Sequence, residues 1–306
     1  MEAIKVPELE NVGLDPKRAI DQQLLLLKHF VEALSPVYGI GALNDINSYT
    51  LGIICKLIKQ VESYILVRGN NKDYNTSCSI IRMLADTVAS FKLIYGCSDA
   101  DERLFRHYLY VLDGVSLSKK ELSVIPEKND SISTADYKAL KLQMEEAYNN
   151  RVAAENAIEN LLSKHPYIKL YPDIAQTLIK KRNWKYKDIA NYNDKSGDSY
   201  SWNGLYAFLG GESDFQNFMS YLSQYAHGLS MSNLQFDASY DEFYSLDFFI
   251  FHLIYVAGGV CSKMWKGEPA LTESSACNTK YNKLFIELLT LEQCKDLEQY
   301  IKNNRK

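Results

Sequence analysis

The chain has 306 residues, of which 46% are hydrophobic and 24% are charged, a composition typical of a soluble globular protein that can bury a large core. Lys and Arg total 34 and Asp and Glu total 38, so the formal net charge is −4. This mild acidity argues against a protein coated with positive charge for nucleic-acid binding, although it is compatible with a local basic patch.

The cysteines and the apolar segments bear on where the protein resides. The six cysteines are scattered without a CxxC pair, and the first residues lack the apolar core of a secretory leader, so we expect reduced thiols and a cytoplasmic location. The strongly apolar run Phe243–Cys261 contains Asp247 and His252, and its uncharged part is short for a bilayer span. We therefore expect a buried helix there and no membrane partner.

Apolar residues recur with helical spacing almost throughout, and alternating β-branched runs are missing, so the expected fold class is all-α, a multi-helix bundle. Asp15-Pro16 marks the start of the first helix and Ser35-Pro36 its end. Ser98 is expected to cap a helix that ends at Asp113-Gly114. The expected helices cover residues 20–34, 45–67, 74–95, 98–114, 134–164, 214–227, 240–265 and 281–303.

The segment 134–164 is predicted as one long, charged helix in the middle of the chain. Its apolar positions approach a heptad repeat that Arg151 interrupts; they are Leu140, Met144, Ala147, Ala154, Ile158 and Leu161. Two interpretations are open, a protruding helix that binds a partner and a helix that lies along the bundle. The less regular segment 165–212 follows, and the whole chain, residues 1–306, is expected to form a single helical domain.

The chain lacks the familiar signatures of catalysis. No nucleotide-binding glycine loop, nucleophile elbow, HExxH or kinase motif occurs, and the five histidines show no metal-ligand spacing. We therefore expect no metal and no cofactor, and whether the protein is an enzyme stays open. The strongest chemical signals are two polar pairs in apolar helices, Arg82 with Asp86 and Ser223 with His227, each four residues apart and so on one helix face.

Each pair has a functional and a structural interpretation. His227 could transfer protons near neutral pH while Ser223 orients it. Alternatively, His227 only bonds a carbonyl or hydroxyl of the core. Arg82 and Asp86 form either a constrained site or a clamp between helices. The sequence leaves open whether the two pairs face each other across the bundle.

Two basic clusters are candidate sites for phosphate or nucleic acid. The first comprises Arg103, Arg106 and His107 on one expected helix. Its alternative interpretation is a charged helix face that is simply exposed to solvent. The second is the basic segment Lys180–Lys187, in which five basic residues alternate with two aromatic ones, so it could hold phosphates and stack bases. Its alternative is a folded corner anchored by the tryptophan. The candidate binding residues in this segment are Lys180, Lys181, Arg182 and Trp184.

Arg82 with Asp86, the segment around Trp184 and a late Tyr-x-Ser-x-x-x-His element occur in this order. Together they resemble a bacterial all-helical family known only as a domain of unknown function, over about residues 45–260. Such proteins are distantly similar to the HEPN class of nucleotide-binding and RNA-cleaving domains, many of which act in defence against phage. The HEPN signature has four to six residues between an Arg and a His, whereas Arg103 and His107 here enclose three, and Asp86 stands where the family favours Glu.

Three functions from different classes follow as expectations. The first is an interaction or sensor protein, in bacterial defence or stress response, that works with a protein partner or a second copy of itself. The second is a HEPN-like, metal-independent ribonuclease or toxin with RNA as its substrate, in which His227 is the acid–base group, Ser223 orients it and Arg82 stabilises charge on phosphorus. The third is a nucleotide-binding module whose arginines receive phosphate.

Overall fold

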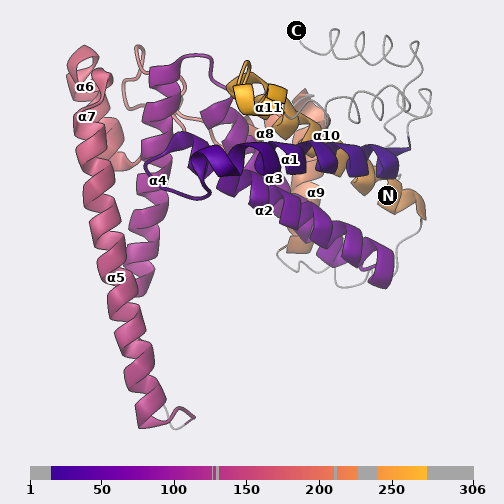
Figure 1. Ribbon diagram of the computed structural model, residues 1–306, viewed down its shortest axis with the longest axis horizontal. Helices are drawn as coiled ribbons and strands as arrows, with labels where there is room; N and C mark the ends of the chain where they lie inside the picture. The colour runs from indigo at the N-terminus through magenta and orange to yellow at the C-terminus, as the bar shows by residue number, and fades with distance from the viewer. Residues whose placement is uncertain (1–14, 126, 129–130, 210–211, 227–239, 274–306) are drawn as a thin grey trace. The chain divides into compact units, whose positions relative to one another are not determined.

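The computed structural model describes residues 15–125, 127–128, 131–209, 212–226 and 240–273 (Figure 1). Helices and their connections account for this part of the chain, apart from an isolated β-bridge between Tyr186 and Ser199, which confirms the all-α fold class. The helices are α1 (Pro16–Tyr38), α2 (Ile46–Leu66), η2 (Val67–Asn71), α3 (Tyr74–Tyr95), α4 (Ala100–Leu122), α5 (Thr134–Ser163), α6 (Pro166–Leu170), α7 (Pro172–Lys181), α8 (Trp202–Ala207), α9 (Glu212–Ala226), α10 (Tyr240–Met264) and α11 (Pro269–Glu273).

The chain divides into two compact units, which we describe separately. Unit 1 comprises residues 1–42, 47–96 and 202–306, and unit 2 comprises residues 43–46 and 97–201. The expectation of a single domain stays a prediction. The expected helix at 281–303 lies outside the described residues.

Unit 1 is built around α3 and α10, which pack against each other. α10 also contacts α1, and α3 also contacts α8 and α9. α3 begins at Tyr74, where the Asp73 side chain accepts a hydrogen bond from the Thr76 amide at 3.0 Å, as expected of an N-cap. Apolar side chains are buried on most sides of α3, so neighbouring helices can pack around it.

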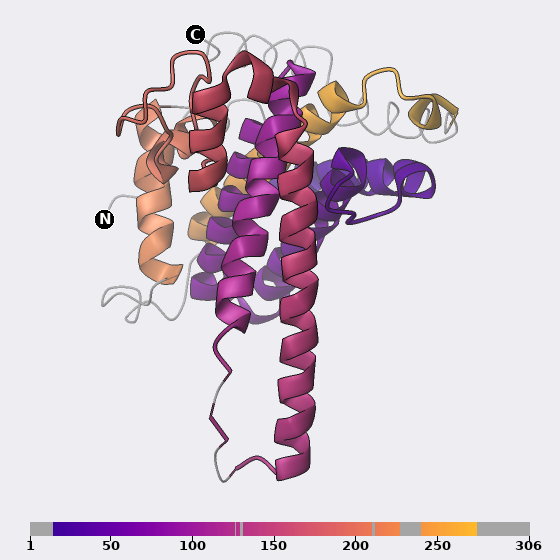
Figure 2. The same ribbon diagram turned by 90° about the vertical axis from the view of Figure 1, so that its left-hand side faces the viewer.

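Unit 2 contains a helical hairpin formed by α4 and α5. Arg151 Nε donates to Ser118 Oγ at 3.2 Å, and Ser116 Oγ donates to Glu155 at 2.7 Å, so the two helices run antiparallel. Figure 2 shows α5 continuing past the end of α4. The short helices α6 and α7 follow, and the chain then runs without regular structure to residue 201.

α1 is longer than its sequence pattern indicates. The helix continues through Pro36 to Tyr38 instead of stopping at Ser35-Pro36. A proline in the last turn interrupts little of the remaining helix. Gly39 ends the helix with a φ of 70°, and its amide donates to the Ser35 carbonyl at 2.9 Å.

α4 also differs from the expectation at both ends. Asp99, not Ser98, is the N-cap, and its side chain accepts from the Glu102 amide at 2.7 Å. The helix does not end at Asp113-Gly114 but continues to Leu122. The turn after Gly114 buries part of its surface in the contact with α5, which compensates for the low helix propensity of glycine.

A buried ion pair joins the apolar helix α10 to the end of α2. Asp247 is 1% exposed, accepts a hydrogen bond from Tyr64 at 2.8 Å and forms an ion pair with Arg68 at 2.6 Å. Burial raises the pKa of the Asp247 carboxyl, while Tyr64 and Arg68 oppose this rise. Arg68 lies in η2, a π-helical turn that places its guanidinium on Asp247.

Among the helices that the structure describes, α10 meets the length and composition criteria for crossing a bilayer. The segment concerned is Phe243–Met264, and 56% of its most apolar window is buried within the structure. A core helix of a globular protein meets the same length and composition criteria. Its packing against α1 and α3 agrees with the buried helix expected from the sequence.

We predict that Asp247→Asn lowers the free energy of unfolding by about 1–3 kcal/mol, because it leaves the largely buried Arg68 guanidinium without its counter-charge, a loss that is partly offset by no longer burying the charge of Asp247. Urea denaturation measures the change. Glu62→Gln is the control in the same unit, since Glu62 pairs with Lys28 and Lys59 at the surface, and it is expected to cost less than about 1 kcal/mol. Equal costs for the two substitutions would contradict the prediction.

Candidate functional site

Three of the four residues in the predicted polar pairs are connected in unit 1. Arg82 Nε donates to Ser223 Oγ at 2.9 Å, and Arg82 Nη1 forms an ion pair with Asp86 on the same helix. Tyr206, which no sequence motif distinguishes, donates to Asp86, and its ring lies 4.8 Å from the Arg82 guanidinium. The cluster therefore ties α3 to both α8 and α9.

The hydrogen bonds of this cluster favour a clamp over a catalytic site. Ser223 Oγ donates its proton to the Met219 carbonyl at 2.8 Å, and Asp86 already accepts from two donors. Burial and the bond to Asp86 raise the pKa of Tyr206, so its hydroxyl stays protonated. His227, the predicted acid–base residue, lies outside the described residues, and its role stays a prediction.

In unit 2, Arg106 points into the interior. Its side chain is 3% exposed, and it donates to Glu102 Oε1 from Nη2 at 2.6 Å and from Nε at 3.0 Å. The same guanidinium donates to the backbone carbonyls of Trp184, Tyr186 and Lys187 at 3.0, 2.7 and 3.3 Å. Because its donors are occupied by the protein itself, Arg106 holds the basic segment in place and has no donor left for a phosphate.

The other two residues of this first basic cluster also bond the protein's own backbone. His107 is fully buried, its Nε2 bonds the Leu43 carbonyl at 3.1 Å, and burial lowers its pKa to about 4. Arg103 is half-buried and donates to the Cys97 carbonyl at 3.5 Å. These placements do not support the phosphate site expected at Arg103, Arg106 and His107.

The aromatic residues of the basic segment belong to the core. Trp184 is 5% exposed, its Nε1 donates to Asp113 at 3.1 Å, and its ring meets the Tyr110 ring edge-on at 5.1 Å. Tyr186 is fully buried and packs over the Arg106 guanidinium, 3.8 Å from it. The segment is therefore a corner anchored by its tryptophan, one of the two interpretations of the sequence, and neither ring is placed to stack on a base.

A second network joins the end of α7 to the hairpin. Arg182 adopts a left-handed conformation with a φ of 51° and donates to Glu155 at 3.1 Å. Glu155 also accepts from Ser116 at 2.7 Å and pairs with Lys119. Burial alone would raise the pKa of the Glu155 carboxyl, but the hydrogen bonds from Lys119 and Ser116 and the charge of Lys119 hold it below its usual value.

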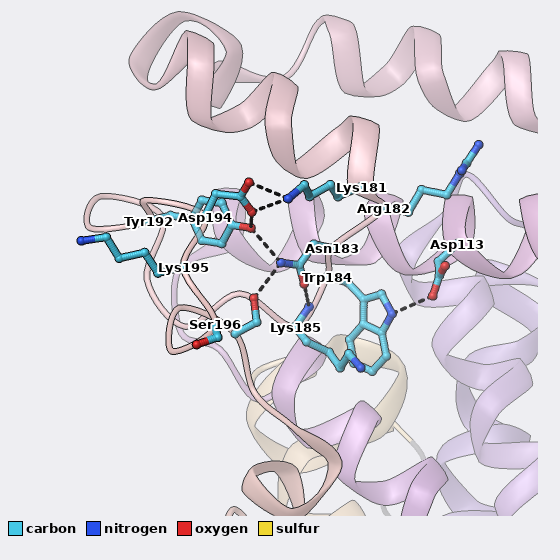
Figure 3. Close-up of a pocket in the computed structure, with 11 residues that line it drawn as sticks. Asp113, Lys181, Arg182, Asn183, Trp184, Lys185, Tyr192, Asp194, Lys195 and Ser196 are labelled. Carbon is cyan, nitrogen blue, oxygen red and sulfur yellow. Dashed lines mark hydrogen bonds and ion pairs between the residues drawn. The ribbon is translucent and has the colours of Figure 1, made fainter.

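The outer side of this corner forms an open cavity of about 480 Å³, which we call the basic groove (Figure 3). Four cationic side chains and two carboxylates are among the residues that line it: Lys181, Arg182, Lys185, Lys195, Asp113 and Asp194. Lys181 Nζ lies 2.6 and 2.5 Å from the two oxygens of Asp194, and Arg182 turns its guanidinium away from this pair. Lys185 belongs to the basic segment predicted from the sequence, whereas no sequence pattern marks Lys195 or Asp194 as a binding residue.

Lys195 extends from a loop that is organised around a carboxylate. Asp198 accepts hydrogen bonds from the amides of Asn193 and Lys195 at 2.8 and 3.0 Å. These backbone bonds hold the pKa of Asp198 below its usual value. In Figure 3 the Lys195 side chain projects outward from this loop, and its ammonium makes no side-chain hydrogen bond to another residue of the described chain.

Within the described ranges, no three His, Cys, Asp or Glu side chains lie close enough together to hold a metal ion. No known family model, curated protein or solved structure matches this chain. The resemblance to a bacterial helical family and to HEPN domains therefore stays a prediction, and the site has to be judged on its own geometry.

We predict that His107→Gln reduces the loss of stability on mild acidification. The pKa of His107 is about 4 in the folded chain, against about 6.5 for an unfolded one, so its contribution is complete above pH 6.5 and declines as the pH falls toward 4. Between pH 6.5 and 5 this decline amounts to about 2 kcal/mol.

The measurement is the free energy of unfolding of both proteins across this pH range. The introduced glutamine keeps a donor for the Leu43 carbonyl but does not titrate. Burial also lowers the pKa of His29, His165 and His252, so the wild type alone does not isolate His107, whereas the difference between the two proteins does. Parallel pH profiles would contradict the assignment.

Proposed function

We propose that this chain is a binding module for a small phosphorylated ligand, which it holds in the basic groove. The observation that carries the proposal is that cationic side chains outnumber carboxylates by four to two around one cavity of about 480 Å³. Lys181 pairs with Asp194 and Arg182 with Glu155, whereas Lys195 forms no ion pair with any residue of the described chain. Small-molecule sites commonly have volumes of about 300–1,000 Å³, so a nucleotide-sized ligand is compatible with this space. Positive charge lining a concave surface concentrates anions there.

The groove favours recognition through phosphate over recognition through a base. Trp184 is buried beneath the groove, so a base has no exposed indole face to stack on. Lys185 and Lys195 supply ammonium groups that bind phosphate oxygens as point charges. The hydroxyls of Ser196 and Ser199 also line the groove and can donate to the same oxygens.

The Lys181–Asp194 pair sets a limit on anion binding. Asp194 engages Lys181 through both carboxylate oxygens and also accepts from Tyr192 at 3.0 Å. A phosphate that approaches Lys181 therefore competes with Asp194 and is repelled by its charge. This arrangement predicts that neutralising Asp194 strengthens binding.

The proposal corresponds to the nucleotide-binding function expected from the sequence, with groove lysines in the place of arginines. The ribonuclease interpretation depends on His227, outside the described residues, and on Ser223, whose proton is committed to a backbone carbonyl. A role in bacterial defence, a cytoplasmic location and RNA as a partner stay predictions from the sequence and its resemblance.

We predict opposite effects from two substitutions in the groove. Lys195→Gln is expected to weaken binding of ATP and of tripolyphosphate about tenfold, because a bond to a charged group is lost. Asp194→Asn is expected to tighten both, because Lys181 is released from its counter-ion; asparagine tolerates the φ of 62° at this position and keeps an acceptor for Tyr192. Isothermal titration calorimetry at low salt measures both affinities.

The matched control is Lys180→Gln, which removes one positive charge from an exposed residue outside the groove lining and is expected to leave affinity within about twofold. Adenosine is expected not to bind. Binding of ATP but not of tripolyphosphate would overturn recognition through phosphate. The proposal also fails if neither probe binds at millimolar concentration, or if Lys195→Gln and Asp194→Asn shift affinity in the same direction.

A further inference from the structure

The N-terminal half of α5 has no helix packed along it within unit 2. The buried residues of α5 are Glu155, Ile158 and Leu162, all in its C-terminal half, where α4 lies alongside. Arg151 contacts Ser118, which is near the C-terminal end of α4, so the residues before about 148 project past that helix. Figure 2 shows this projection clearly.

The projecting half continues the heptad pattern of the buried half. Tyr137 and Met144 occupy a positions, and Leu140 and Ala147 occupy d positions; we call these four residues the tip seam. Leu140 is 38% exposed, and Met144 and Ala147 are partly exposed. The seam ends before Arg151, the next a position, because that side chain bonds Ser118 of its own chain.

We propose that the tip seam pairs with the tip seam of a second copy of this chain, as a short parallel coiled coil. The charges beside the tip seam are the reason for proposing a second copy of this chain as the partner. In a parallel pair, Asp136 at a g position faces Lys141 at the next e position of the other copy, which gives two attractive pairs by symmetry. Within one chain Asp136 accepts from Ser133 at 2.7 Å and Lys141 lies 3.8 Å from Glu145, and these exposed contacts compete only weakly with the pairs between copies. In an antiparallel pair e faces e and g faces g, and no opposite charges meet.

The association is weak and reversible. The tip seam spans residues 137–147, about 16 Å of helix, and such a small contact falls at the low end of specific interfaces. Dimers therefore form in proportion to protein concentration. This surface lies on α5, and the basic groove is not part of it, so self-association and ligand binding are tested separately.

Sedimentation velocity over a concentration series tests the proposal with the full-length chain. We expect the wild type to shift from monomer to dimer as concentration rises. Leu140→Glu, which places like charges in the seam, weakens the dimer more than about tenfold. The matched control is Leu142→Glu, the same change two residues away on an exposed leucine outside the seam (67% exposed), which leaves the dimer intact.

A charge reversal tests the orientation. Lys141→Glu weakens the parallel dimer, because the introduced carboxylate would face Asp136 of the other copy, and the double variant Asp136→Lys with Lys141→Glu restores it. Circular dichroism verifies that each variant keeps its helix content. A wild type that stays monomeric at every concentration overturns the proposal, as does a dimer that tolerates Leu140→Glu as well as Leu142→Glu. Failure of the double variant to recover overturns the parallel arrangement.

Discussion

The Arg106 guanidinium is the constraint on which the irregular part of unit 2 depends. It is buried, paired with Glu102 one turn earlier on α4, and bonded to three carbonyls of the basic segment, at Trp184, Tyr186 and Lys187. Buried carbonyls outside helices and sheets need donors, and arginine supplies several from one rigid plane. A cation on α4 thus supplies hydrogen-bond donors to a segment whose strand-like backbone pairing is limited to an isolated β-bridge.

This constraint explains how exposed lysines come to line a groove. Trp184 and Tyr186 fill the space beside Arg106, so the chain between and beyond them must turn its other side chains outward. Lys185, which lies between these two residues in the chain, consequently lines the cavity, and Asp113 is fixed there by its bond to the Trp184 indole. Lys195 comes from a separate loop, and its side chain projects outward. The part of the groove formed by the basic segment is therefore positioned by the buried side chains of Arg106, Trp184 and Tyr186.

The sequence predicted the helices well because their apolar spacing is local information. α3 and α5 match their expected spans to within a residue, and the polar spacing of Arg82 and Asp86 correctly placed both on one face. The partners of these residues depend on tertiary packing. Tyr206 lies 120 positions from Asp86, and nothing in its neighbourhood distinguishes it from the many other tyrosines of the chain. Arg106 looked like a ligand-binding residue because charge in a sequence does not indicate burial.

The anchored half of α5 accounts for the order of its projecting half. An isolated helix of about fourteen residues is marginal in water, mainly because its first turn is costly to form. In this chain the turn is already formed where Glu155 binds Ser116, Lys119 and Arg182, and Ile158 and Leu162 are buried. The residues before Arg151 extend an existing helix, and Ser133 caps its far end through the Asp136 amide. A seam that no neighbouring helix covers within unit 2 can therefore stay helical and ready to pair.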